Sequence, residues 1–474
     1  MMFVGRDREI KALTAQFDSS KPSLTVTYGR RRVGKSTLLQ QVLDGRDHVY
    51  FQATRITDGE SRMLFQRAIA QALGSDALLN NALDWEGIFG YLRNWIAAKK
   101  KPLVVAIDEF PYLCEDNKAL PSILQKIWDE VRGEGTPLKL VLCGSAVAFM
   151  EGLLYERNPL HGRQSCDLQI NPLSFRDSAR FFPGWKAMDA LRAYGILGGM
   201  PYYLSLCDPE QDIAANVCKL VLEDGAPLRD EPMQLLQAEL NSPARFAAIL
   251  RAVADGLTER GEITNRVMQK GEQSSSITPY IDRLEAMRLL RRMHSLDVAA
   301  PERSRNARYY LDDPFLAFHF RFVLPNISAL QSGHADTVWT EMIEPSLDEF
   351  MGDRFEEICR SWLALYGQER LEMPARTVGK IWAAEYDIDV AGTLLDGRTV
   401  AGECKWARKP VGFAVLNDLK RDTARAKYYA DNEPPLHLLF ARSGYTPELR
   451  EWVAEDPNLL LLRPEDLLQP LDLT

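Results

Sequence analysis

Short apolar runs alternate with longer amphipathic segments over about the first 170 residues of this 474-residue chain. Four short, largely apolar runs, SLTVTYG, HVYFQAT, PLVVAIDEF and LKLVLCGSA, each have the pattern of a buried strand. Residues 35–43, 61–73 and 85–98 have the apolar spacing of helices. This alternation predicts βαβ units, and therefore an α/β fold with a mostly parallel sheet over residues 1–171.

The pattern changes after residue 171. Strand-like runs disappear from 172 to 240, where helical periodicity dominates, so a helical domain is expected there. Residues 241–325 contain helical stretches, a turn-rich stretch and a β-hairpin that ends at 307–311. Residues 326–344 are mostly polar and are predicted to be a linker. Residues 345–474 have the pattern of a helix, strands, a second helix and more strands, which predicts a second α/β domain.

Residues 29–36 have the sequence GRRRVGKS, a full match to GxxxxGK followed by Ser or Thr. A strand precedes this loop and an amphipathic segment follows it, a context that disfavours the alternative of a chance glycine-rich turn. The glycines let backbone N–H groups face phosphate oxygens at a helix N-terminus. Lys35 would reach the β- and γ-phosphates and the Ser36 hydroxyl would ligate Mg²⁺, so ATP and Mg²⁺ are the predicted cofactors. The predicted nucleotide contacts are Gly29, Arg32, Val33, Gly34, Lys35, Ser36 and Thr37.

Two carboxylates end the apolar run LVVAIDE. Asp108 would hold the Mg²⁺ through water, and Glu109 would polarise the attacking water, which makes the predicted site hydrolytic. The next run ends in LCGS, which places Ser145 near the γ-phosphate as a sensor. The alternatives are a solvated strand end for the acidic pair and an ordinary strand terminus for Ser145.

Six motifs in order, FVGRDREI, GRRRVGKS, VVAIDEF, LCGS, NPLHGR and GGMPYY, resemble the archaeal-type ATPases of the STAND class, which are related to AAA+ proteins and replication initiators. The resemblance implies a P-loop NTPase core whose residues 3–6, including Gly5 and Arg6, line the adenine pocket. It implies that residues 172–240 form a helical lid and that Pro201 packs on the adenine. Arg163 matches an arginine finger or γ-phosphate sensor. A structural salt bridge is the alternative for Arg163, and a helix-starting proline is the alternative for Pro201.

Composition narrows the class of protein. Apolar residues make up 46% and charged residues 26% of the chain, as in ordinary globular proteins. The net charge of −9 argues against a protein that coats nucleic acid, although it allows a local basic patch. Seven cysteines without CxxC pairs and six dispersed histidines make a zinc site improbable. There is no signal-peptide pattern and no apolar run near the ~20 residues of a membrane span, so we expect a cytoplasmic protein.

Residues 242–311 predict a winged-helix domain. Helices are expected at 246–254, 263–269 and 276–289, the last with Ser276 as its N-cap, followed by a hairpin. These residues carry 12 Lys or Arg against 8 Asp or Glu, a net charge of +4. DNA docking is therefore expected, and a packing role is the alternative. The candidate phosphate contacts are Arg288, Arg291, Arg292, Arg303, Arg305 and Arg308.

The C-terminal region brings carboxylates and a lysine to neighbouring strands. Asp387 and Asp389 share one face of the strand in EYDIDVAG, and Glu403 and Lys405 share one face in VAGECKW. A hairpin turn at 395–398 would place Asp389 beside Glu403, and Gly402 would let a phosphate backbone approach closely. Two carboxylates bind a hard cation, and a lysine activates water. A same-face ion pair is the structural alternative.

This arrangement resembles the PD-(D/E)xK nucleases and the C-terminal domain that accompanies archaeal-type ATPases. The resemblance implies a restriction-endonuclease-like domain with Glu356, Asp389, Glu403 and Lys405 at its site and a metal ion on Asp389 and Glu403. No proline precedes the aspartate, which leaves Asp387 as a second candidate.

The favoured hypothesis is an ATPase coupled to a nuclease-like domain that binds or cleaves DNA. A STAND-type signalling ATPase, whose C-terminal domain only recognises a partner, is the alternative. A DNA-binding protein with vestigial domains is the third possibility. An arginine finger acting in trans would require a homo-oligomer.

Overall fold

The computed structural model describes residues 3–268, 277–298, 307–430 and 432–469. The chain divides into two compact units. Unit 1 comprises Met1–Leu173 together with Met200–Tyr202, and unit 2 comprises Ser174–Gly199 and Tyr203–Thr474. Among the helices of these described ranges, none is long and apolar enough to cross a membrane.

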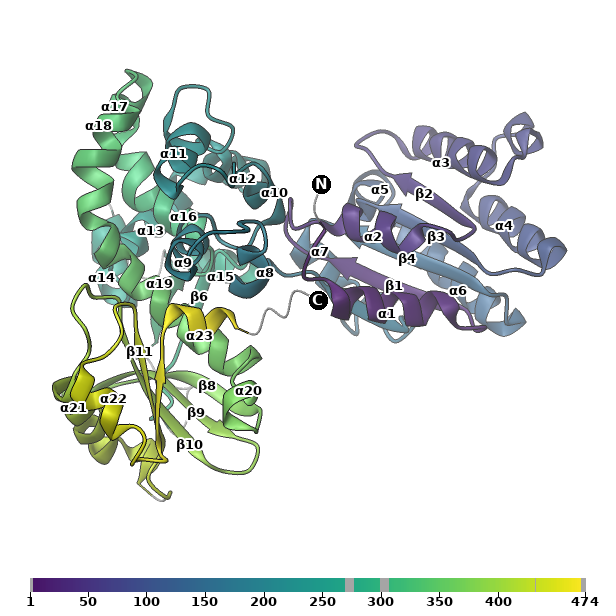
Figure 1. Ribbon diagram of the computed structural model, residues 1–474. Helices are drawn as coiled ribbons and strands as arrows, with labels where there is room; N and C mark the ends of the chain where they lie inside the picture. Colours follow the sequence, from purple (N-terminus) through teal and green to yellow (C-terminus); the bar gives the residue numbers. More distant parts are fainter. Residues whose placement is uncertain (1–2, 269–276, 299–306, 431, 470–474) are drawn as a thin grey trace. The chain divides into compact units, whose positions relative to one another are not determined.

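Unit 1 contains a five-stranded parallel sheet in the order β2-β3-β4-β1-β5 (Figure 1). β4 therefore lies between the strand that precedes the phosphate loop and the strand that ends in Asp108. The predicted parallel α/β sheet is confirmed. β5 was not predicted, because CDLQ is a half-exposed edge strand without an apolar run. The strands are β1 (Ser23–Tyr28), β2 (His48–Gln52), β3 (Leu103–Asp108), β4 (Leu138–Gly144) and β5 (Cys166–Gln169).

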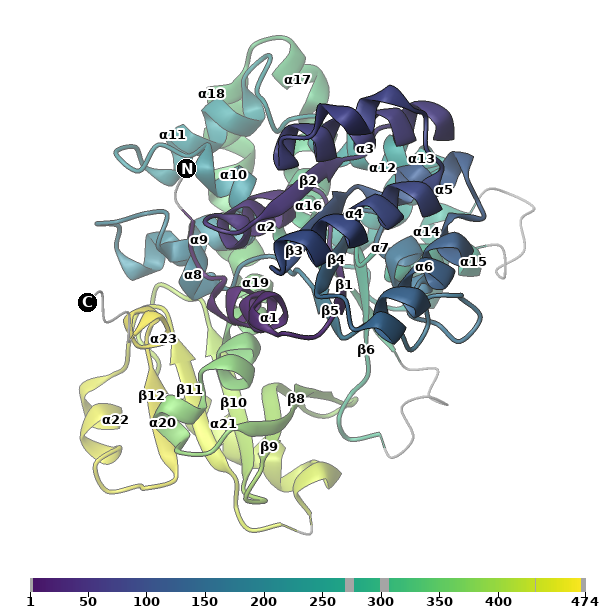
Figure 2. The same ribbon diagram turned by 90° about the vertical axis from the view of Figure 1, so that its right-hand side faces the viewer.

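Helices flank this sheet, as Figures 1 and 2 show. The predicted helices at 35–43, 61–73 and 85–98 are present in α2, α3 and α4. α3 begins with a capping box in which Thr57 and Glu60 satisfy each other's backbone N–H groups. The helices of unit 1 are α1 (Asp7–Asp18), α2 (Lys35–Leu43), α3 (Asp58–Leu73), α4 (Trp85–Lys99), α5 (Phe110–Asp116), α6 (Leu120–Glu134) and α7 (Val147–Gly152).

Unit 2 begins with helices, as the sequence predicts for residues 172–240. These are α8 (Phe175–Ala179), α9 (Ala187–Leu197), α11 (Ile213–Val217) and α12 (Glu231–Glu239), with α10 (Pro201–Ser205) starting in unit 1. Three helices and an antiparallel strand pair follow: α13 (Pro243–Ala254), α14 (Arg260–Val267), α15 (Thr278–Ala286), β6 (Leu290–Met293) and β7 (Arg308–Leu311). This is the predicted order of elements, and the winged-helix assignment stays a prediction. Ser276, Arg303 and Arg305 lie outside the described residues.

The prediction that residues 326–344 form a loop-like linker is wrong. Residues 326–344 are largely helical and include α17 (Ile327–Gln331) and α18 (Ala335–Val338). Several of their apolar side chains, among them Leu330 and Trp339, are buried and therefore belong to the core. The polar composition was misleading, since widely spaced apolar positions suffice to bury one face of a helix. The segment follows α16 (Pro314–Phe318) and continues into α19 (Glu344–Leu365).

The C-terminal sheet is mixed, in the order β12-β11-β10-β9-β8. β8, β9 and β10 are antiparallel neighbours, whereas β10, β11 and β12 run parallel. The predicted hairpin is confirmed, since Thr399 pairs with Thr393 and Gly402 pairs with Val390. The elements are β8 (Ala375–Trp382), β9 (Asp387–Leu394), β10 (Thr399–Lys405), α21 (Phe413–Arg425), β11 (Leu436–Ala441), α22 (Pro447–Trp452), β12 (Leu459–Leu462) and α23 (Pro464–Leu468). The nuclease-like class of this domain stays a prediction.

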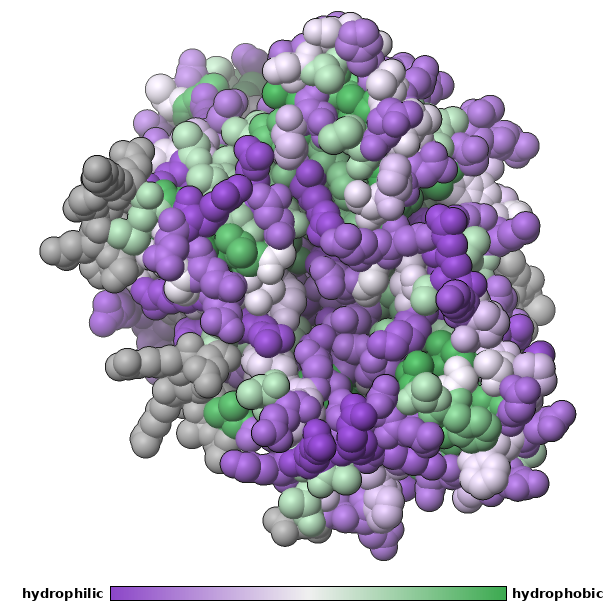
Figure 3. All heavy atoms as spheres, turned by 90° about the vertical axis from the view of Figure 1, so that its left-hand side faces the viewer, coloured by the Kyte–Doolittle hydropathy of each residue, from purple (hydrophilic) through white to green (hydrophobic). Residues whose placement is uncertain are grey.

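On the face shown in Figure 3, hydrophilic side chains predominate and apolar side chains form separate patches. That face therefore presents no single large apolar surface.

Candidate functional site

The phosphate loop joins the carboxyl end of β1 to the N-terminus of α2. Gly34 is the N-cap of α2 with φ +92°, and Arg32 also has positive φ, at +67°. A Cβ atom at Gly29 would lie 2.2 Å from the carbonyl oxygen of Ile170. Glycine is therefore required at position 29 by close backbone approach and is favoured at position 34 by conformation.

The Lys35 ammonium is held inside this loop. Its Nζ donates to the carbonyl oxygens of Gly29 at 2.8 Å and Arg30 at 3.2 Å, and the residue is only 5% exposed. Two backbone carbonyls thus keep a buried cation where the sequence predicts phosphate contact.

Asp108, at the end of β3, receives hydrogen bonds from several elements. Its Oδ2 accepts from the hydroxyls of Ser36 and Tyr50, both at 2.6 Å, and its Oδ1 accepts from the backbone N–H of Glu109 at 3.0 Å. Burial by itself would raise the pKa of Asp108, but the hydrogen bonds from Ser36, Tyr50, Cys143 and the backbone N–H of Glu109 together outweigh it and hold that pKa below its usual value. Adjacent hydroxyl and carboxylate oxygens of Ser36 and Asp108 are a fitting partial ligand set for Mg²⁺. Tyr50 was not predicted, because nothing in HVYFQ distinguishes it from an ordinary strand tyrosine.

Glu109 takes a left-handed backbone conformation, with φ +54°. Its Oε2 accepts hydrogen bonds from the backbone N–H of Ser145 at 3.1 Å and from the Ser145 hydroxyl at 2.8 Å. Because β4 lies between β1 and β3, the residue that follows β4 lies between the loop and the acidic pair. The structure therefore brings Ser36, Asp108, Glu109 and Ser145 together.

Arg6 contacts the phosphate loop through its guanidinium group. The residue is 4% exposed, and its guanidinium donates to the carbonyl oxygens of Asn171 and Val33, both at 2.8 Å. Pro201 begins α10, and its ring lies 3.8 Å from the position of a Cβ on Gly34. The Arg32 guanidinium lies 4.6 Å from the centre of the Tyr202 ring. Arg6 and Pro201 thus contact or adjoin the loop, and their roles toward adenine stay predictions, as does that of Gly5.

Arg163 is not brought to the phosphate loop of its own chain. Its guanidinium forms a two-point ion pair with Asp129, with both N–O distances at 2.9 Å. Ser165 donates its backbone N–H to Leu24, near the start of β1, whereas the loop leaves the opposite end of that strand. The structure thus contains the structural salt bridge, and an arginine finger in trans stays a prediction.

The four predicted nuclease-like residues form one cluster in unit 2. Lys405 Nζ lies 2.5 Å from Glu403 Oε1, and Asp389 accepts the backbone N–H of Cys404 at 3.0 Å. Glu356 comes from α19. Burial raises the pKa of its carboxyl group, and the nearby charge of Asp389 raises it further. Burial and Asp389 likewise raise the pKa of Glu403.

A second lysine, which the sequence did not reveal, lies inside this cluster. Lys380 Nζ is 2.8 Å from Glu356 Oε2, 3.0 Å from Asp389 Oδ1 and 3.2 Å from Asp387 Oδ1. Arg360 adds hydrogen bonds to Glu356 and to the carbonyl oxygen of Asp389. Lys380 lies on β8, so only the pairing of β8 with β9 could have predicted its position.

The predicted metal site does not fit the arrangement as it stands. Among the described residues, no group of three or more His, Cys, Asp or Glu is disposed to hold a metal ion. The ammonium of Lys380 lies where Glu356 and Asp389 converge, so these carboxylates are already compensated. The assignment of a metal to Asp389 and Glu403 stays a prediction.

Two of the arginines predicted to contact DNA pair within the chain. Arg291 forms an ion pair with Glu357 at 2.7 Å, and the Arg308 guanidinium lies 4.8 Å from the Trp382 ring centre. The Ser295 hydroxyl also accepts the backbone N–H of Trp382 at 3.0 Å. These contacts favour the packing alternative for this part of the domain. Arg292 is exposed.

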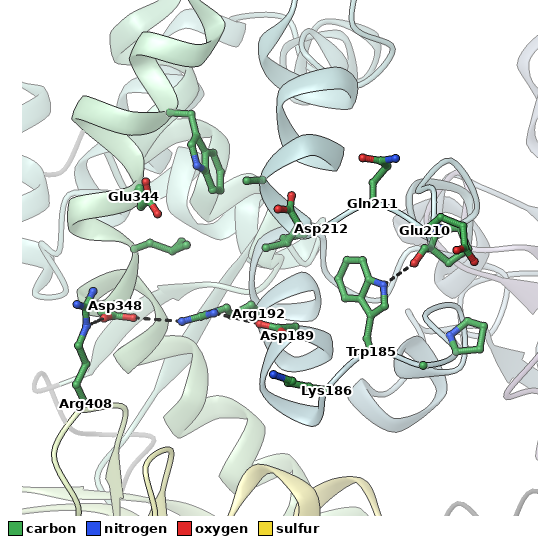
Figure 4. A pocket seen from close by; sticks show the side chains of 17 residues that line it. Trp185, Lys186, Asp189, Arg192, Glu210, Gln211, Asp212, Glu344, Asp348 and Arg408 are labelled. Atoms are coloured by element: carbon green, nitrogen blue, oxygen red, sulfur yellow. Dashed lines mark hydrogen bonds and ion pairs between the residues drawn. The ribbon is translucent and has the colours of Figure 1, made fainter.

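Unit 2 also contains a pocket of about 790 Å³ between α9, α19 and the 209–214 segment (Figure 4). Its charged side chains compensate one another: Asp348 pairs with Arg408 at 2.9 Å, and Arg192 pairs with Asp189 at 3.1 Å. Trp185 donates its indole N–H to the carbonyl oxygen of Pro209 at 2.7 Å. None of the residues assigned to the two candidate sites lines this pocket.

Residues 3–207 match the family described as an ATPase domain predominantly from Archaea, and residues 319–423 match a family of archaeal and bacterial proteins of unknown function. An uncharacterized protein of Methanocaldococcus jannaschii is 32% identical over 409 residues, which are 85% of this chain and 88% of that protein. An uncharacterized ATP-binding protein of the same organism is 39% identical over 46 residues, 10% of this chain and 78% of that protein. The structure of a Walker-type ATPase of Pyrococcus abyssi is similar with a TM-score of 0.50 at 21% identity. The alignment covers 67% of this chain and 95% of that one, and at this identity it indicates the fold alone.

Proposed function

Since the chain belongs to the family of ATPase domains found predominantly in Archaea, we propose that unit 1 binds ATP at residues 29–37 and hydrolyses it. The observation that carries this proposal is the contact of Ser36 with Asp108 beside the pair formed by Glu109 and Ser145. A nucleotide-binding loop, two oxygen ligands for a cation and a candidate base lie at neighbouring strand ends, which is what hydrolysis requires.

Each of these side chains has a role in that reaction. When ATP binds, Lys35 leaves the carbonyl oxygens of Gly29 and Arg30 and donates to the β- and γ-phosphates instead. The charged phosphate oxygens replace the two lost acceptors. Ser36 and Asp108 would hold Mg²⁺, which would neutralise the charge that develops on the phosphate oxygens. Glu109 accepts a proton from the attacking water, for which its carboxylate must turn from Ser145.

Nucleotide binding tests the loop assignment. Lys35→Ala removes the cation that faces the phosphates, and we expect about a hundredfold weaker binding of a fluorescent ATP analogue, from the strength of charge-assisted hydrogen bonds. Lys11→Ala, which removes an exposed lysine from α1, is the control. Unchanged binding by the Lys35 variant would show that the loop is not the nucleotide site.

For unit 2 we propose a nuclease-like domain that acts on or binds DNA. The support is the cluster of Asp389, Glu403 and Lys405 on paired strands with Glu356 from the preceding helix. The order of helix, hairpin, helix and parallel strand around it also suits this proposal. We derive no metal-dependent step, because Lys380 takes the cation position.

The exposed Arg292 offers a test of DNA docking. We expect salt-sensitive binding of duplex DNA in fluorescence anisotropy, and a reduced salt dependence in Arg292→Ala. Arg291→Ala serves for comparison, because Arg291 is already paired with Glu357. Absence of DNA binding by the wild type at low salt would contradict the proposal.

A signalling ATPase is the second candidate. Two ion pairs favour it. Arg291, a predicted DNA contact, is paired with Glu357, and Glu356, a predicted residue of the nuclease-like site, is paired with Lys380. In that case nucleotide exchange would change the state of unit 2 without any nucleic acid, and hydrogen exchange in unit 2 would differ between ATP and ADP.

A further inference from the structure

Arg31 of the phosphate loop is an exposed cation with a neutral partner. Its guanidinium donates to the Tyr112 hydroxyl at 2.6 Å. Within the described ranges, no carboxylate pairs with Arg31, whereas Arg55 and Arg163 of the same unit are each paired with one. An arginine has five N–H donors, and the contact with Tyr112 uses one of them. The loop therefore carries an unbalanced positive charge with donors to spare for an anion.

Tyr112 holds this guanidinium on the side of the loop where the γ-phosphate would lie. Tyr112 belongs to α5, which begins directly after Glu109, and its backbone N–H donates to the carbonyl oxygen of Glu109 at 3.0 Å. Glu109 is the proposed base, and a base must lie beside the water that attacks the γ-phosphate. Because Arg31 reaches the first turn of α5, it is directed toward the base and the γ-phosphate.

Two other arginines that are candidates for a phosphate contact are held elsewhere. The Arg32 guanidinium lies 4.6 Å from the centre of the Tyr202 ring, next to Pro201 at the start of α10. That is the side of the loop where the adenine is predicted. Arg163 is engaged in an ion pair and is not brought to the loop of its own chain. Of these three arginines, Arg31 is the one directed toward the γ-phosphate.

We propose that Arg31 contacts the γ-phosphate of ATP bound to its own chain and stabilises the charge that develops there during hydrolysis, and that Tyr112 positions its guanidinium. This role rests on the proposed ATPase function of unit 1 and adds a catalytic residue to it. In the reaction the water oxygen bonds to the γ-phosphorus while the bond from that phosphorus to the β–γ bridging oxygen breaks. Glu109 takes a proton from the water, ADP and inorganic phosphate are released, and Arg31 supplies charge without exchanging a proton.

Nucleotide affinities separate a γ-phosphate contact from a general contact with the loop. Arg31→Ala should bind the non-hydrolysable analogue adenylyl imidodiphosphate about tenfold more weakly than the wild type, and ADP with less than about a twofold change. Arg67→Ala is the control, because it removes an exposed arginine of α3 whose polar contact among the described residues is the Met63 sulfur. Its two affinities should stay at the wild-type values. Equal losses for the two nucleotides in Arg31→Ala, or no loss for either, would overturn the γ-phosphate contact.

Steady-state phosphate release in the presence of Mg²⁺ measures the catalytic role. The kcat of Arg31→Ala should fall at least about a hundredfold, because an arginine at the γ-phosphate contributes about 10³–10⁵ in rate. Tyr112→Phe removes the hydroxyl and keeps the ring on which the Arg55 guanidinium lies, so kcat should fall several-fold with KM nearly unchanged. A wild-type kcat in Arg31→Ala would overturn the role of Arg31, and a wild-type kcat in Tyr112→Phe would overturn that of Tyr112.

A second substitution and a mixing experiment complete the test. Arg31→Gln keeps a donor for Tyr112 but no charge, so it should lose hydrolysis as Arg31→Ala does. Both variants should unfold at the wild-type temperature without nucleotide, since Arg31 is exposed. Lys35→Ala retains Arg31, and Arg31→Ala retains Lys35, so an equimolar mixture of the two should hydrolyse ATP no faster than they do separately. Recovery of hydrolysis in the mixture would overturn a contact within one chain.

Failure of the Arg31 role and failure of the proposed function give different results. A wild type that neither binds nor hydrolyses ATP refutes both. Hydrolysis that is lost in Lys35→Ala and kept in Arg31→Ala upholds the ATPase function and refutes the role of Arg31. If the wild type binds ATP without measurable hydrolysis, the selective loss of affinity for the ATP analogue in Arg31→Ala decides, and its absence refutes the contact.

Discussion

Tyr50→Phe removes one of the hydrogen bonds that hold the buried carboxylate of Asp108. The Tyr50 hydroxyl lies 2.6 Å from Oδ2, and Asp108 is 1% exposed, so water cannot replace the lost donor. The hydroxyl of Ser36 and the backbone N–H of Glu109 remain. Loss of a hydrogen bond to a buried charged group costs about 1.5–3 kcal/mol of folding free energy.

For a unit of this size, that loss lowers the melting temperature by roughly 3–12 °C. The assay is thermal unfolding with and without Mg²⁺ and ATP, because the transition that moves with nucleotide belongs to unit 1. Tyr155→Phe is the control, since Tyr155 is 63% exposed and should change the free energy by less than about 0.5 kcal/mol. A Tyr50 variant as stable as the Tyr155 variant would refute the anchoring of Asp108 by Tyr50.

Three further predictions follow from single contacts. Gly29→Ala would place a Cβ 2.2 Å from a backbone oxygen, so ATP binding should be lost in an equilibrium binding assay, and retained affinity would contradict that geometry. Gly133→Ala, in α6 with no atom within 4 Å of the added Cβ, should raise stability by up to about 1 kcal/mol in thermal unfolding, and a loss would contradict this. Burial lowers the pKa of His319 to about 4, so the unfolded chain binds more protons below pH ~6.5, and stability falls as pH drops toward 4. His319→Phe should flatten the dependence of melting temperature on pH across that window. His437, whose pKa is also lowered, destabilises the wild type and the variant alike as pH falls, so some pH dependence remains in both. Parallel curves for the two proteins would contradict the assignment to His319.

The elements that hold the phosphate loop could be predicted because they have strong local patterns. Short, largely apolar runs predicted β1 to β4, although β2 is buried only at alternate positions, and the glycine and lysine spacing located the loop between β1 and α2. The contacts of Tyr50 and Arg6 were harder to predict. Tyr50 reaches Asp108 only because β2 lies beside β3, and Arg6 donates to a backbone carbonyl 27 residues further along the chain. Side-chain partners far apart in the sequence leave no periodicity to detect.

The C-terminal site was predicted only in part, for a related reason. The hairpin joins Asp389 to Glu403 over a short span, so turn length and strand alternation sufficed. Lys380 reaches the same cluster through β8, whose ARTVGKIW sequence carries bulges and a half-exposed pattern. Gly402 was misjudged: a Cβ there would lie 3.1 Å from Val390 and 3.2 Å from Phe440, so this glycine serves packing rather than approach of a phosphate.

Hydrolysis of ATP by Glu109→Gln is the most direct test of the central claim that unit 1 is a Walker-type ATPase whose base is Glu109. Glutamine can keep the hydrogen bonds from Ser145 but cannot accept the proton of the attacking water. Steady-state phosphate release should fall at least about a hundredfold while ATP binding is retained, whereas Glu115→Gln, which changes an exposed carboxylate nearby, should match the wild type. Phosphate release by Glu109→Gln at the wild-type rate would contradict the claim.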